Sequence, residues 1–173
     1  MSLLLTRDEI ISKIDLNKVN WVNRYSTNCY AYALGLDVPQ YEIGDYAYAP
    51  GVMSSSPIFL PDYRVFTLDM LVKNLYRDFK YLGIEYRIIK PDDKIREDEW
   101  KIALFVTLAY FNNKEKIEDY HFLRQREDGT WYHKNGFEGI VSNRDRLFKE
   151  IIDPSKCKLN DRDYVRTLAL KLH

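Results

Sequence analysis

Apolar residues recur at helical spacing in two stretches of the chain. After Thr67 they follow one another every three or four positions as far as Leu82, and Gly83 stands where helices commonly end. Near the N-terminus, Thr6-Arg7-Asp8-Glu9 forms a capping box that predicts a shorter helix through about residue 14. A third, short helix is predicted over residues 29–35, where an apolar run follows polar residues and stops at a glycine.

The second half of the chain is dominated by patterns typical of β-strands. Residues 37–61 hold four prolines and two glycines and predict an irregular loop, and residues 143–152 predict a short helix or a turn. Because helices come first and strands follow, we expect a single α+β domain over residues 1–173 with an antiparallel sheet. The predicted strands and hairpin cover residues 84–89, 102–111, 119–135 and 164–172.

The predicted hairpin carries a histidine on each strand, and its register decides whether the two meet. A two-residue loop would put His121 and His133 on opposite faces of the sheet, since side chains alternate along a strand. A three-residue loop over 127–129 pairs His133 with Leu123, and both histidines then share a face. Glutamate, aspartate and glycine in that order favour the three-residue loop, in which Gly129 is left-handed.

The overall composition excludes several classes of function. The chain has 26 basic and 26 acidic residues, so we expect no nucleic-acid partner attracted by bulk charge. It has no apolar run of membrane-spanning length and no basic, apolar leader, so we expect a cytoplasmic protein without a membrane partner. Release by lysis and export without a signal both stay open. With 2 cysteines and no metal-ligand spacing, we expect neither a metal nor another cofactor.

Cys29 and the two histidines carry most of the nucleophilic and basic chemistry in this chain. Cys29 falls in the first turn of the short predicted helix, where the helix dipole is expected to lower the pKa of its thiol. His121 is the candidate base for Cys29, and His133 the candidate orienter of His121. Asp119, on the same predicted face, is a less favoured orienter.

An oxyanion formed during acyl transfer requires fixed hydrogen-bond donors. The backbone N–H of Cys29 is one candidate for this role. The amide of Asn23 or the hydroxyl of Tyr25 could supply the second donor. The sequence alone does not choose between these two residues.

The order of Cys29 at a helix start, His121 on one strand and His133 on the next resembles the papain-like cysteine peptidase superfamily. Within it, the chain is most similar to the NlpC/P60 and CHAP group, which cleaves amide bonds, often in peptidoglycan peptides. Residues 28–34 and 119–131 also resemble segments of uncharacterised bacterial and phage proteins. The resemblance covers residues 21–136 and implies a papain-like fold, with N-terminal helices and the nucleophile helix packed on the sheet.

Three functions are consistent with these residues. The first is a cysteine hydrolase that cleaves an amide or peptide bond in a peptide or protein substrate, peptidoglycan peptides included. The second is a binding or inhibitory protein on the same fold, of phage or bacterial origin. The third is a cysteine deamidase or acyltransferase that modifies a host protein. The sequence does not define the substrate or the oligomeric state.

Overall fold

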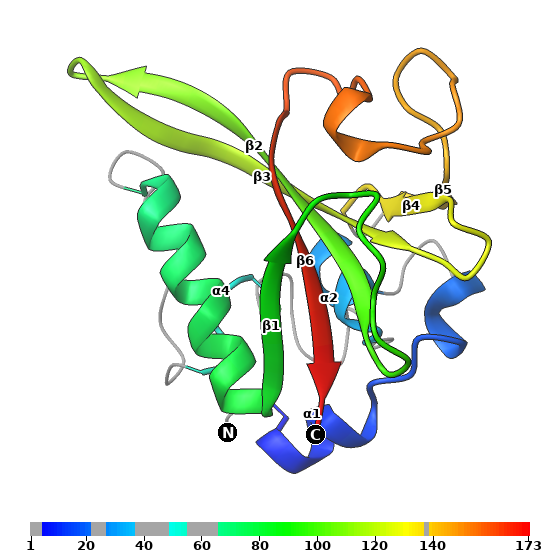
Figure 1. Cartoon of the computed structure of the whole chain (residues 1–173). Coiled ribbons are helices and arrows are strands. Elements are labelled where there is room, and N and C mark those ends of the chain that lie inside the picture. The colour runs from blue at the N-terminus through cyan, green and yellow to red at the C-terminus, as the bar shows by residue number, and fades with distance from the viewer. Residues whose placement is uncertain (1–4, 22–26, 37–48, 55–65, 137–138) are drawn as a thin grey trace.

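An antiparallel sheet of six strands forms the centre of the protein (Figure 1). The computed structural model describes residues 5–21, 27–36, 49–54, 66–136 and 139–173. The spatial order of the strands is β1-β6-β2-β3-β4-β5. The α+β class with an antiparallel sheet, predicted from the order of helices and strands, is therefore confirmed. The strands are β1 (Ile84–Ile89), β2 (Trp100–Phe111), β3 (Lys114–Gln125), β4 (Trp131–Lys134), β5 (Val141–Ser142) and β6 (Asp163–Leu172).

Three α-helices lie among the described residues, each at a place where the sequence predicts one. They are α1 (Arg7–Ser12), α2 (Cys29–Leu34) and α4 (Leu68–Leu82), and 3-10 helices cover Lys18–Trp21 and Pro154–Lys156. The Thr6 capping box forms as predicted, since Thr6 and Glu9 each accept a hydrogen bond from the other's backbone N–H. α2 and α4 both end at a glycine in the left-handed conformation.

The hairpin of β3 and β4 has the register that brings the two histidines to one face. His133 pairs with Leu123, and Gly129 has a φ of 80°, as expected for the three-residue loop. One neighbouring feature differs from the predictions. β3 begins at Lys114, so β2 and β3 form one long hairpin that projects beyond the sheet (Figure 1). Residues 143–152 form a turn closed by an isolated bridge between Arg144 and Glu150, which is one of the two forms that the sequence predicts.

The two faces of the sheet bury separate groups of apolar side chains. On one face, α1, α2 and α4 cover alternate residues of β2, β3 and β6. On the other face, a smaller core gathers around Trp131 and is covered by residues 151–159. Residues 121 and 123 of β3 face this smaller core, whereas residues 122 and 124 face the helices. The smaller core consists of Ala103, Phe105, Leu123, Trp131, Ile151 and Leu159.

The short helix α2 is held on β3 by buried polar and aromatic contacts. The guanidinium of Arg124 donates to the carbonyl oxygens of Tyr32 and Leu16, both at 3.2 Å. The ring of Tyr30 packs on that of Phe122, with centroids 5.0 Å apart. A six-residue helix is unstable alone, so these tertiary contacts keep it formed.

Asp78, on α4, is a buried carboxylate that joins three segments. It accepts hydrogen bonds from the hydroxyl of Tyr30 at 3.0 Å and from the backbone N–H groups of Gly51 and Ser54 at 2.7 and 3.0 Å. Gly51 has a φ of 97°, and a Cβ there would lie 2.7 Å from the side chain of Asn74, so only glycine fits this turn. Burial raises the pKa of Asp78, while these hydrogen bonds lower it.

Replacing Asp78 with asparagine should destabilise the protein by about 1–3 kcal/mol, because one acceptor oxygen is lost and a buried donor is left without a partner. Chemical denaturation would measure the free energy of unfolding. Asp69→Asn, on the same helix but exposed and paired with the exposed Lys73, is the matched control. It should cost about 0.5 kcal/mol or less. Equal losses in both variants would contradict the role assigned to Asp78.

Candidate functional site

Cys29 is the first residue of α2 and is almost completely buried, with 7% of its surface exposed. Asn28 caps the helix, and its side-chain oxygen accepts a hydrogen bond from the backbone N–H of Ala31 at 2.9 Å. Every residue of α2 is buried, so the thiol lies in a largely apolar environment. Its position at the first turn of a short capped helix agrees with the prediction.

The expected lowering of the Cys29 pKa is wrong for this structure. Burial raises the pKa of the thiol to about 11, and the carboxylate of Asp119 adds to the rise. Backbone N–H groups of Phe122 and Tyr30 and the charge of Arg162 lower it, but by less. A helix of six residues has a weak dipole, and loss of water around the thiol outweighs it. At neutral pH, Cys29 is therefore a neutral thiol.

His121 and His133 form a direct hydrogen bond inside the protein. Nε2 of His121 lies 2.9 Å from Nδ1 of His133, and the two rings are nearly perpendicular, at 86°. Nε2 of His133 lies 2.9 Å from the carbonyl oxygen of Arg144. The exposed fractions are 1% for His121 and 6% for His133. The structure thus brings together the two histidines in the order that the hairpin register predicts.

The chain of hydrogen bonds defines which ring nitrogens carry protons when both rings are neutral. The carbonyl oxygen of Arg144 can only accept, so Nε2 of His133 donates to it. Nδ1 of neutral His133 then has no proton and accepts from Nε2 of His121. Nδ1 of His121 is left with a free lone pair. His121 is therefore held as a base at one particular atom.

Both rings are neutral at physiological pH. Burial lowers the pKa of His121 well below its usual value, and the neighbouring His133 and Arg162 lower it further. Burial also lowers the pKa of His133, against a smaller opposing effect of the Arg144 carbonyl. The neutral state that the hydrogen-bond chain requires is therefore the resting state.

Cys29 and the histidines approach β3 from different sides. α2 packs on the face that carries Phe122, whereas His121 points to the opposite face. The thiol reaches the level of the sheet at the backbone N–H of Phe122, the residue directly after His121. Within the described part of the chain, no hydrogen bond joins the thiol of Cys29 to His121. The thiol thus lies beside the backbone of the residue after His121, while the imidazole of His121 points to the other face of β3.

The remaining candidate residues are placed differently. Asp119 pairs with Arg162, at 2.7 and 2.8 Å, and not with a histidine. Asn23 and Tyr25 lie outside the described residues. Sequence analysis missed Arg162 and the carbonyl of Arg144, because both reach the site from the segment after β4 and no local motif marks them.

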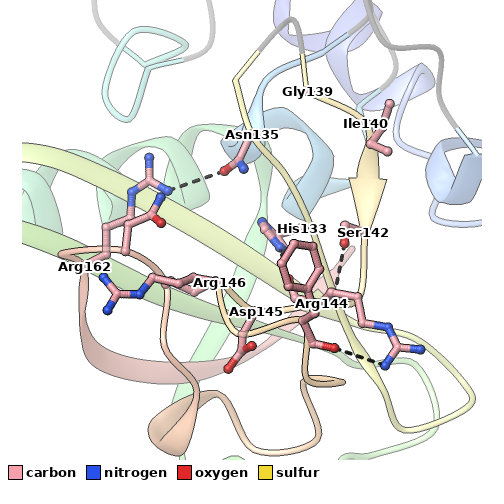
Figure 2. A pocket seen from close by; sticks show the side chains of 12 residues that line it. His133, Asn135, Gly139, Ile140, Ser142, Arg144, Asp145, Arg146 and Arg162 are labelled. Carbon is pink, nitrogen blue, oxygen red and sulfur yellow. Dashed lines mark hydrogen bonds between the residues drawn. The ribbon is translucent and has the colours of Figure 1, made fainter.

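A cavity of about 650 Å³ borders the histidine pair (Figure 2). His133 and Arg162 line it, and Nη1 of Arg162 donates a hydrogen bond to the side-chain oxygen of Asn135 at 3.4 Å. Arg144 and Arg146 belong to the loop that orients His133. The cavity thus shares residues with the candidate site.

Neither a metal-binding group nor a membrane-spanning helix is found among the described residues. They contain no group of three or more histidine, cysteine, aspartate or glutamate side chains that could hold a metal ion. In the same part of the chain, no helix is long and apolar enough to cross a membrane. Comparison of the whole chain with protein-family models, curated proteins and solved structures gives no match.

The buried histidines should make the protein less stable as the pH falls. Their pKa values are lowered in the folded state, so the unfolded chain takes up protons first. Stability from this source is complete above the unfolded pKa of about 6.5 and declines below it, by up to about 1.4 kcal/mol per pH unit for each histidine.

Denaturation between pH 7.5 and 5.5 would measure this slope. His121→Gln should reduce it, whereas His173→Gln, at the exposed end of the chain, should leave it steep. A slope that is the same in wild type and His121→Gln would contradict a buried, neutral His121.

Proposed function

We propose that this protein is a cysteine-dependent hydrolase of amide bonds on a papain-like fold, with Cys29 as nucleophile, His121 as base and His133 as orienter. The observation that carries the proposal is the hydrogen-bond chain from the Arg144 carbonyl through His133 to His121, which leaves Nδ1 of His121 unprotonated. A buried base aimed by a second side chain is the arrangement that nucleophilic catalysis requires. The position of the thiol beside the next residue of the same strand supports it.

The reaction begins from a neutral pair and not from an ion pair. Nδ1 of His121 takes the proton of the Cys29 thiol as the sulfur attacks the carbonyl carbon of the substrate. The carbonyl π electrons move to its oxygen, and the backbone N–H groups at the start of α2 are the candidate donors to that oxyanion. The protonated His121 then gives its proton to the leaving nitrogen, the C–N bond breaks and a thioester remains. Water, deprotonated by His121, attacks the thioester and releases the acid and the free thiol.

His133 stabilises the imidazolium that forms during this cycle. Its Nδ1 accepts from Nε2 of His121 before and after proton transfer, so the ring of His121 keeps one orientation. The carbonyl of Arg144 holds His133 in the tautomer that can accept. The mechanism requires the thiol to reach Nδ1 of His121 when substrate binds, because the thiol and the imidazole approach β3 from different faces in this structure.

A deamidase or acyltransferase would use the same three residues, and only the leaving group or the acceptor differs. A non-catalytic binding protein is the other alternative. The raised pKa of the buried Cys29 thiol favours this alternative, whereas a lowered pKa would have favoured an enzyme. Reactivity and turnover therefore have to be measured separately.

Alkylation of Cys29 by iodoacetamide should show whether His121 activates the thiol. A thiol assisted by a neutral imidazole reacts at a rate that is nearly independent of pH between the lowered pKa of His121 and the raised pKa of Cys29. An unassisted buried thiol reacts about tenfold faster for each pH unit in that range. Mass spectrometry of the two cysteine peptides from pH 6.5 to 9 would give both rates.

Cys157 is the internal control, because burial and Asp145 raise the pKa of its thiol to about 12 and no histidine is bonded to it. His121→Ala should convert Cys29 from a flat profile to the tenfold profile of Cys157. Equal, steep profiles for both cysteines in the wild type would contradict the hydrolase and favour a binding protein.

Turnover should depend on the two histidines to different degrees. With a peptide digest of bacterial lysate as substrate, His121→Ala should slow hydrolysis by about 10²–10⁴-fold, because the thiol loses its base and the amine its acid. His133→Asn should keep more activity than His133→Ala, since an amide oxygen can still accept from His121. Cys29→Ala supplies the background. New peptide termini indicate a peptidase, whereas side-chain amides converted to acids indicate a deamidase; neither product above background contradicts both.

A further inference from the structure

The cavity beside His133 combines positive charge with apolar residues at its mouth. Arg144, Arg146 and Arg162 line it, and Figure 2 shows the guanidinium group of Arg144 on the opposite side of His133 from those of Arg146 and Arg162. Ile140 and Phe148 also line it and are 69% and 85% exposed. Large apolar side chains with this exposure in one cavity are typical of a surface that contacts a ligand.

The positive charge of the cavity is only partly neutralised. Arg162 is paired with Asp119. Among the described residues, neither Arg144 nor Arg146 has a carboxylate within 4.0 Å. The described residues that line the cavity thus include three arginines and one carboxylate, that of Asp145.

The carboxylate of Asp145 accepts hydrogen bonds from the backbone. Its oxygens accept from the N–H groups of Leu147, Lys149 and Lys158 at 2.8, 3.0 and 3.2 Å. Burial raises the pKa of Asp145, but these hydrogen bonds lower it further than burial raises it. The carboxylate of Asp145 therefore stabilises the loop through these hydrogen bonds and does not form an ion pair with Arg146.

The loop held by Asp145 presents Phe148 in a strained conformation. Phe148 has a φ of 59°, in the left-handed region that bulky residues rarely adopt, and its side chain lies almost fully in solvent. Neither packing nor backbone preference explains a phenylalanine there. A residue kept against local preference at the mouth of a cavity indicates a role in binding.

We propose that this cavity binds an acidic segment of a peptide substrate, with a carboxylate on Arg146 and an adjacent apolar side chain against Ile140 and Phe148. Carboxylates match the paired N–H donors of arginine, and a peptide is the ligand that the neighbouring cysteine site would require. The inference rests on the proposed function for the choice of a peptide. Binding in the cavity would affect the catalytic histidines, because the carbonyl oxygen of Arg144, in the same loop as Arg146, orients His133.

The test measures binding without turnover, in the Cys29→Ala protein. Two fluorescein-labelled hexapeptide mixtures serve as probes, one with glutamate followed by leucine at its centre and one with glutamine in place of glutamate. Fluorescence anisotropy at low salt should show the glutamate mixture binding at least about tenfold more tightly, with the difference shrinking as salt is added. Arg146→Gln should remove the preference.

Phe148→Gly gives the sharpest variant, because glycine adopts the left-handed conformation freely. It should weaken binding of the glutamate mixture about tenfold while the melting temperature stays equal or rises. Leu147→Ala, on the same loop but outside the cavity lining, should keep wild-type affinity. Equal affinity for both mixtures, no binding of either, or unchanged binding in Phe148→Gly would each overturn the proposal. Acidic peptides that bind but are not cleaved by the wild type would instead refute the hydrolase and leave the site intact.

Discussion

The docking of α2 on β3 is the contact on which the rest of the structure depends. A six-residue helix cannot persist alone, and the buried guanidinium of Arg124 ties its last turn and the chain at Leu16 to the central strand. A buried cation must satisfy its donors, so this connection tolerates little displacement. Asp78 secures the same helix from the other side through Tyr30. Together these contacts fix the position of Cys29 relative to the sheet.

Burial decides the protonation states of the candidate site. Removal of water raises the pKa of Cys29 and lowers those of His121 and His133, so the neutral form of each group is favoured. An ion pair of thiolate and imidazolium would require solvent or further charges to stabilise it. General-base transfer at the moment of attack requires neither, which is why a buried thiol with a raised pKa is compatible with a cysteine hydrolase.

The candidate catalytic site and the cavity beside His133 are connected through shared residues. The carbonyl of Arg144 holds His133, while the side chain of the same residue lines the cavity. Arg162 lines the cavity, pairs with Asp119 and lowers the pKa of all three candidate catalytic groups. A ligand in the cavity would therefore change both the position and the electrostatics of the base.

Local sequence determined the helices, their caps and the hairpin register, because capping boxes, terminal glycines and the turn at Gly129 act within a few residues. That register alone placed His121 and His133 on one face. Only the tertiary structure decided the pKa of Cys29, since burial depends on segments distant in the chain. It also decided the position of β6 between β1 and β2, the ion pair of Asp119 with Arg162 and the orientation of His133 by the carbonyl of Arg144. These depend on long-range packing, for which the sequence holds no local signal.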